Sequence, residues 1–177
     1  MSLKEKIQEN LKIALKQKRE IEVSVLRMLS AAILNKEKEK RYKLSKEKPE
    51  IEIEELKKES PLYKELEKES SLTDEEVIEV ISSEIKKRKE SILAFEKGER
   101  KDLVEKEKKE LEVLKNYLPE QLSETELKKL VKETIEKVGA KDMKDIGKVM
   151  GELMPKVKGR AEGSQVSNIV RELLKND

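Results

Sequence analysis

The amino-acid sequence predicts an all-α protein with two parts, an N-terminal domain of long amphipathic helices over residues 1–118 and a small three-helix bundle over 119–177. Charged residues make up 45% of the chain, apolar residues 35% and aromatic residues 2%. This composition is typical of helices with narrow apolar stripes and could not fill a broad sheet core. So much charge also occurs in disordered chains, but here Leu, Ile and Val recur at helical spacing almost throughout. The sequence is also rich in Lys and Glu, a composition compatible with a thermophilic source.

The first two apolar stripes run over residues 3–15 and 21–33, and each repeats every three or four residues. The charged stretch 16–20 separates them. The signal for a turn there is weak, so the sequence leaves open two helices or one bent helix.

Residues 36–70 are nearly all charged, basic up to Lys48 and acidic from Glu50 onward. Pro49 and Pro61 interrupt this stretch, and helices rarely continue through a proline. Its few apolar residues suggest short helical pieces that dock weakly. We interpret the stretch as a solvated insertion, while the alternative is a nucleic-acid-binding arm, since basic runs can serve that purpose.

Strong helix starts appear twice. Thr73 with Glu76, and Ser123 with Glu126, have the spacing of a capping box. In this motif the Ser or Thr side chain accepts from the backbone N–H of the Glu, and the Glu side chain accepts from the backbone N–H of the Ser or Thr. Between them, Gly98 is placed to end a helix. A proline at position 119 prevents simple continuation of the preceding helix, so we expect the domain boundary at 118–119.

The C-terminal bundle is predicted from three further apolar stripes. The stripe over 127–138 ends at Gly139, which suits the end of a helix. Asp142 can cap the next helix, which we expect to bury Met143 and Met154 among its apolar residues. Ser164 is a natural cap for the last helix, with the stripe 166–174 on its buried side.

Residues 145–163 hold four of the six glycines. Gly147 and Gly151 are four residues apart, hence on one helical face, where we expect them to permit close packing of helices. The stretch 156–163 reads as a basic turn, and its glycines would let backbone amides approach phosphates. For Gly159 and Gly163 a purely conformational role in the turn is an equal alternative. The residues that we expect to contact RNA are Lys148, Lys156, Lys158, Gly159, Arg160, Gly163 and Ser164.

The lack of Cys and His excludes disulfides, thiolate nucleophiles, imidazole bases and Cys/His zinc sites. Ser164 is the only serine in the glycine-containing stretch, and its capping role already accounts for it. We therefore expect neither intrinsic catalysis nor a cofactor or metal. No apolar run approaches the ~20 residues of a membrane-spanning helix, and the N-terminus lacks a signal-peptide pattern, so we expect a soluble cytoplasmic protein. A net charge of +2 means that any RNA contact must come from a local patch.

Several of these motifs together resemble the YqeY-like family. They are the runs 118–123, 145–151 and 158–163 in the C-terminal part, and 24–32, 72–77, 88–92 and 95–98 in the N-terminal part. The resemblance covers most of the chain except about 36–70, which is longer than expected for the family. The same family shares its C-terminal region with the tail of the B subunit of the tRNA-dependent amidotransferase (GatB).

The resemblance implies an all-helical protein with a C-terminal three-helix bundle. In the amidotransferase the related tail recognises tRNA, so the first hypothesis is a tRNA-binding accessory module. Free-standing members are often assigned carbon–nitrogen ligase or tRNA amidase activity with glutamine as amido donor, which is the second. The third is a module that docks on an amidotransferase, an aminoacyl-tRNA synthetase or another part of the translation machinery.

Overall fold

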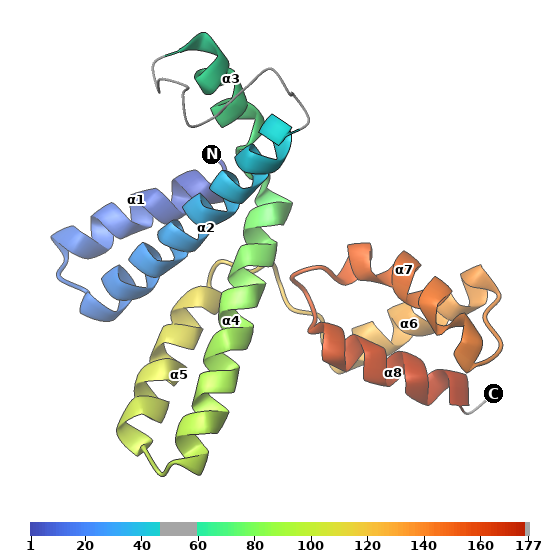
Figure 1. Ribbon diagram of the computed structural model, residues 1–177. Coiled ribbons are helices and arrows are strands. Elements are labelled where there is room, and N and C mark those ends of the chain that lie inside the picture. Colours follow the sequence, from blue (N-terminus) through green and yellow to red (C-terminus); the bar gives the residue numbers. More distant parts are fainter. Residues whose placement is uncertain (47–59, 176–177) are drawn as a thin grey trace. The chain divides into compact units, whose positions relative to one another are not determined.

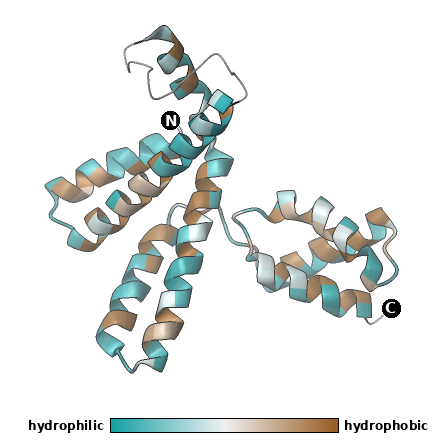
Figure 2. Cartoon of the chain, viewed as in Figure 1, coloured by the Kyte–Doolittle hydropathy of each residue, from teal (hydrophilic) through white to brown (hydrophobic). Residues whose placement is uncertain are grey.

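All regular elements that the structure describes are helices, as the sequence predicts. The structure is a computed structural model, and it describes residues 1–46 and 60–175. The chain divides into two compact units, Met1–Tyr117 and Leu118–Asp177, each of which is described by itself (Figure 1). Apolar and polar residues alternate along the helices in both units, as Figure 2 shows, so each helix has a stripe to bury.

The N-terminal unit begins with a helical hairpin of α1 (Leu3–Lys16) and α2 (Glu20–Lys46). The chain reverses between them over 17–19, where Lys18 adopts a left-handed conformation with φ of 53°. The sequence left open one bent helix or two, and the structure has two. Ser2 and Glu5 form a capping box that starts α1.

A second hairpin consists of α4 (Asp74–Lys97) and α5 (Lys101–Lys115). The predicted capping box of Thr73 and Glu76 is confirmed, because each side chain bonds to the backbone N–H of the other. Gly98 ends α4 as expected. Its φ is −87°, however, and the left-handed position falls on the next residue, Glu99, with φ of 55°.

The interpretation of residues 36–70 as a solvated insertion is corrected for the described parts, residues 36–46 and 60–70. Helix α2 continues through the basic stretch to Lys46, because it buries polar side chains at helical spacing: Glu37, Arg41 and Ser45. Helix α3 (Pro61–Glu69) begins at Pro61, which agrees with the expectation that a helix does not continue through this proline, and it fully buries Leu66. Pro49 and the start of the acidic run lie outside the described residues.

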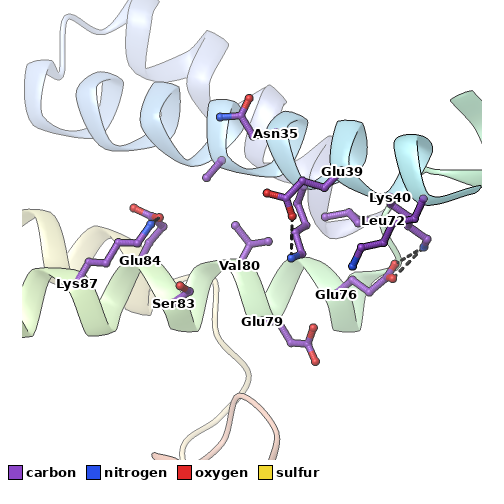
Figure 3. Close-up of a pocket in the computed structure, with 13 residues that line it drawn as sticks. Asn35, Glu39, Lys40, Leu72, Glu76, Glu79, Val80, Ser83, Glu84 and Lys87 are labelled. Atoms are coloured by element: carbon purple, nitrogen blue, oxygen red, sulfur yellow. Dashed lines mark hydrogen bonds and ion pairs between the residues drawn. The ribbon is translucent and has the colours of Figure 1, made fainter. Parts of the chain in front are cut away.

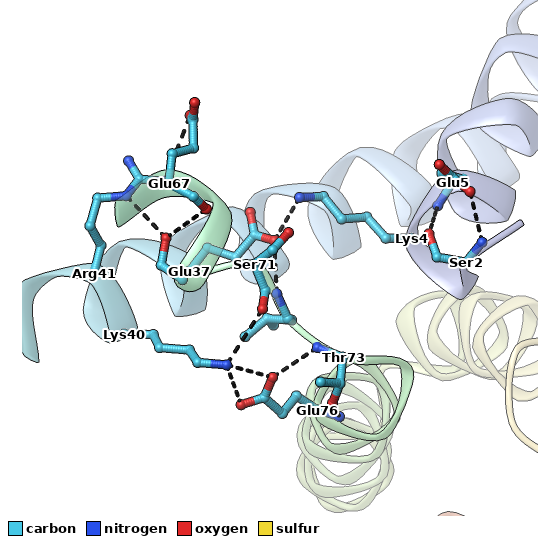
Figure 4. Close-up of polar contacts among 12 residues, drawn as sticks. Ser2, Lys4, Glu5, Glu37, Lys40, Arg41, Glu67, Ser71, Thr73 and Glu76 are labelled. Carbon is cyan, nitrogen blue, oxygen red and sulfur yellow. Dashed lines mark hydrogen bonds and ion pairs between the residues drawn. The ribbon is translucent and has the colours of Figure 1, made fainter. Parts of the chain in front are cut away.

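A polar network fixes α3 and the segment after it onto α2 (Figure 4). The guanidinium of Arg41 donates from Nε to Ser70 Oγ over 3.1 Å and from Nη1 to the Tyr63 hydroxyl over 2.9 Å. One turn earlier on α2, Glu37 accepts from Lys4 Nζ at 2.6 Å and from the backbone N–H of Leu72 at 3.2 Å. Since buried polar groups are costly unless satisfied, this docking is specific and not weak.

The two helices of the second hairpin share a buried ion pair. Arg88 of α4 and Glu110 of α5 are each only 5% exposed, and Arg88 Nη2 lies 2.9 Å from Glu110 Oε2. Glu84, one turn before Arg88, lies 3.6 Å from Nη1. Arg88 Nε is buried with no hydrogen-bond partner among the described residues. The arginine therefore depends on these two carboxylates for compensation of its charge.

We expect Glu110→Ala to destabilise the N-terminal unit by about 3–5 kcal/mol, because it leaves a buried guanidinium without its nearest counter-charge. Chemical denaturation followed by circular dichroism measures this loss. Glu90→Ala is the matched control, since its pair with Lys86 at 4.0 Å is exposed and should contribute less than about 1 kcal/mol. Equal effects of the two substitutions would contradict the assignment.

The C-terminal unit contains α6 (Glu124–Val138), a 3₁₀ turn η2 (Met143–Asp145), α7 (Ile146–Val157) and α8 (Gly163–Lys175). The three helices enclose a core of Leu, Val and Ile side chains. The second predicted capping box, Ser123 with Glu126, is confirmed. Gly139 ends α6 with φ of 64°, the left-handed conformation that glycine adopts without strain.

Three details of this unit differ from expectation. Asp142 caps η2 and not α7, because its side chain accepts from Lys144 N and α7 starts only at Ile146. Met143 and Met154 are 37% and 38% exposed, although both were expected on the buried side. Helix α8 begins at Gly163, so Ser164 lies inside the first turn instead of preceding the helix as its cap.

Candidate nucleic-acid interface

The predicted basic turn is fixed by the segment that precedes α6. The N–H of Leu122 donates to the carbonyl of Arg160 over 2.8 Å, and Gln121 Nε2 donates to the carbonyl of Gly159 over 2.6 Å. In the other direction, Arg160 Nε donates to the Glu120 carbonyl over 3.2 Å. Gly159 has φ of 71°, so a left-handed turn is part of its role. The turn is thus a defined structure, held by bonds that span about 40 residues of sequence.

Two of the predicted lysines on α7 are paired with nearby carboxylates. Lys148 lies 2.8 Å from Asp145, and Lys156 lies 3.1 Å from Glu152. Glu152 also accepts from Lys137 of α6 at 2.6 Å. These pairs reduce the positive potential that the sequence alone suggested, because each lysine faces a carboxylate.

The carboxylates of these pairs stay charged well below neutral pH. The hydrogen bond from Lys137, followed by that from Lys156, lowers the pKa of Glu152. The hydrogen bond from Lys148 is the main cause that lowers the pKa of Asp145. Both carboxylates are partly exposed, with side-chain exposures of 22% for Asp145 and 37% for Glu152, so salt can screen these pairs.

The structure brings four of the seven predicted RNA contacts together, at the end of α7: Lys156, Lys158, Gly159 and Arg160. Lys156 is exposed, while the other three are partly buried. Lys148 lies two turns earlier on α7. Gly163 and Ser164 are exposed in the first turn of α8, where free backbone amides give a helix its positive end.

Gly147 and Gly151 do not serve the packing role that the sequence suggested within this unit. Both are exposed on α7, and a Cβ built on either would meet no atom within 4 Å among the described residues. The core-facing positions of this helix are Val149, Leu153 and Val157, on the other side. The two glycines therefore leave a strip of helix surface without side chains, next to Lys148.

The N-terminal unit contains a groove that was not predicted from the sequence. It has a volume of about 660 Å³, runs between α2 and α4 and is lined by charged residues of both helices (Figure 3). Regular spacing of Lys36, Lys40 and Lys43 on one face of α2 was the available signal. It was overlooked because the stretch was interpreted as an insertion.

Other kinds of site find no support in the part of the chain that the structure describes. Residues 1–46 and 60–175 contain no group of three or more Asp, Glu, His or Cys that could hold a metal ion. Across the same residues, no helix has the length and apolar character needed to cross a bilayer.

The structure is that of an all-α protein with a small three-helix unit. The basic turn of this unit is held in place by hydrogen bonds to the segment before α6. Comparison with protein families shows which class this is. A Yqey-like protein family model matches residues 46–174, and the chain belongs to this family. The resemblance inferred from the motifs is thereby confirmed.

Two curated proteins are similar to the chain. One is Altered inheritance of mitochondria protein 41, mitochondrial, of Pyrenophora tritici-repentis, with 37% identity over 105 residues, covering 58% of each chain. The other is an uncharacterised protein of Schizosaccharomyces pombe, with 47% identity over 51 residues, 29% of this chain and 42% of the relative. The matches thus span about half the length of these relatives.

We expect Gly147→Ala to stabilise the C-terminal unit by about 0.4–1 kcal/mol, because alanine loses less backbone entropy than glycine on folding and the added methyl has free space. Gly139→Ala should instead destabilise it by about 1 kcal/mol, since the position requires φ of 64°. Thermal unfolding of the two variants beside the wild type measures both effects. Destabilisation by Gly147→Ala would show that another part of the protein packs on this strip.

Proposed function

We propose that the C-terminal unit is an RNA-binding module for tRNA or another structured RNA. The observation that carries this proposal is the exposed glycine strip of α7, which leads from Lys148 to the basic turn at 156–160. Among the described residues of the C-terminal unit, nothing from another element lies within 4 Å of a Cβ built at Gly147 or Gly151. A helix surface of this kind lets a sugar–phosphate backbone approach the main chain while lysines on the same helix contact phosphates.

Arg160 is suited to a phosphate contact at the end of this strip. Its Nε donates to the Glu120 carbonyl, which orients the guanidinium. Both Nη groups remain as donors in a planar fork that matches two phosphate oxygens. Shape and backbone recognition of structured RNA needs no aromatic stacking. It therefore suits a chain with one Phe, three Tyr and no Trp.

The paired carboxylates make the surface selective. Asp145 and Glu152 compensate Lys148 and Lys156, so a single isolated phosphate gains little by displacing them. An RNA that presents several phosphates at the right spacing can replace these pairs together. We therefore propose binding that depends on RNA structure and that is weak for unstructured single strands.

We expect the triple variant Lys156→Ala/Lys158→Ala/Arg160→Ala to lose at least about tenfold in tRNA affinity at low salt. Each lost phosphate contact should also lower the slope of log affinity against log salt by about one. Fluorescence anisotropy with labelled tRNA across salt concentrations measures both quantities. A single-stranded oligonucleotide of equal length tests the dependence on RNA structure.

The matched control replaces three lysines elsewhere on the same unit, Lys129, Lys132 and Lys175, so that the net charge changes equally. It should retain most of the affinity. Gly147→Ala adds an independent check, because a methyl on the strip should weaken RNA binding although it stabilises the fold. Identical affinity and salt slope in wild type and triple variant would refute the proposed surface.

Glu152→Gln should change affinity in the opposite direction. Glu152 compensates both Lys137 and Lys156, so its neutralisation frees positive charge without moving a basic residue. We expect tRNA affinity at low salt to rise by about two- to tenfold, an effect that fades as salt screens the charges. Glu133→Gln, on the exposed side of α6, is the comparison; a gain of the same size there would mean that only net charge matters.

A further inference from the structure

The groove between α2 and α4 has two walls of opposite charge (Figure 3). The α2 wall carries three lysines, Lys36, Lys40 and Lys43, against one acid, Glu39. Lys40 Nζ lies 2.8 Å from a carboxylate oxygen of Glu76 on the opposite wall. Lys36 pairs with Glu39 along the helix at 3.1 Å, where both side chains are more than half exposed. This wall is therefore net positive by two charges and open to solvent.

The α4 wall has the opposite sign. Three glutamates, Glu76, Glu79 and Glu84, line it against one cation, Lys87. Glu76 is the partner of Lys40, and Glu84 is bonded to Lys87 at 2.7 Å. Glu79 is exposed. This wall is net negative by two charges, so the groove as a whole is neutral but strongly divided.

Apolar groups lie between the two walls. Ala32, Leu72 and Val80 line the groove and are only partly buried. One turn before Ala32, on the same face of α2, Met28 is 49% exposed. Partly covered apolar surface between charged rims is the usual layout of a protein contact surface, with an apolar centre and a polar rim.

We propose that this groove is the contact surface of a homodimer with two-fold symmetry. A two-fold axis that runs along the groove brings the basic α2 wall of one copy against the acidic α4 wall of the other. The same axis brings the acidic α4 wall of the first copy against the basic α2 wall of the second. A surface that is divided in this way is complementary to itself. The acidic wall repels a polyanion, so nucleic acid is not the occupant.

The length of the groove limits the affinity of this proposed dimer. Each wall spans 12 residues, Ala32 to Lys43 and Glu76 to Lys87, or about 16 Å of helix at about 1.5 Å per residue. Such a face is smaller than a standard protein interface. We therefore expect a dimer in the micromolar range that weakens with salt, because its rim contacts are exposed charges.

Sedimentation equilibrium of the full chain tests the proposal. Lys36→Glu/Lys43→Glu makes both walls acidic, and Glu79→Lys/Ser83→Lys makes the α4 wall basic as well. Each double variant alone should dimerise at least about tenfold more weakly than wild type, because every repulsive contact occurs twice in a two-fold dimer. An equimolar mixture of the two variants should recover dimers, because acidic walls then face basic walls.

The control Lys106→Glu/Lys109→Glu makes the same charge change on exposed positions of α5 outside the groove and should dimerise like wild type. Circular dichroism checks that all variants keep their helices. A wild type that stays monomeric up to about 0.5 mM at low salt would overturn the proposal. So would a mixture that fails to recover dimers, or a control that loses them equally.

Discussion

The buried ion pair between Arg88 and Glu110 is the constraint on which the N-terminal unit depends. With few aromatic side chains, the helices bury only narrow stripes of Leu, Ile and Val, which fix register poorly. A buried arginine tolerates one arrangement of its counter-charges, because any other leaves it uncompensated. Arg88 is held by carboxylates of both α4 and α5, so it sets how the two helices of that hairpin align. Arg41 has the same effect where α2 meets α3.

Helix α2 connects these local constraints into one unit. It packs against α1, α3, α4 and α5, and its 27 residues make it the longest helix among those described. Its C-terminal half uses one face for the buried groups Glu37 and Arg41 and another for the lysines of the groove. The basic stretch is therefore neither a loose insertion nor a free arm. Its charges are divided between holding the fold and forming a surface.

The sequence predicted those elements whose signals are local. Capping boxes at Thr73 and Ser123 and the glycine at 139 act within one turn of backbone, so their residues suffice to identify them. The course of α2 could not be predicted, because its buried face is polar and is satisfied by partners some 30 residues away. Gly147 and Gly151 have helical spacing, but spacing cannot tell whether anything lies opposite. For Ser164, a two-residue shift of the helix start was enough to change its role.

If the C-terminal unit binds RNA as proposed, the proposed dimer would strengthen that binding. In the C-terminal unit, lysines on α7 are matched by nearby carboxylates, so one copy would gain only modest affinity from phosphate contacts. A dimer formed through the N-terminal groove carries two such surfaces. Once one surface is bound, the second meets the same RNA at a high effective concentration, which raises overall affinity without a new contact. A short RNA that can engage only one surface would gain nothing from dimerisation, so the two proposed interactions together would discriminate between RNAs by size.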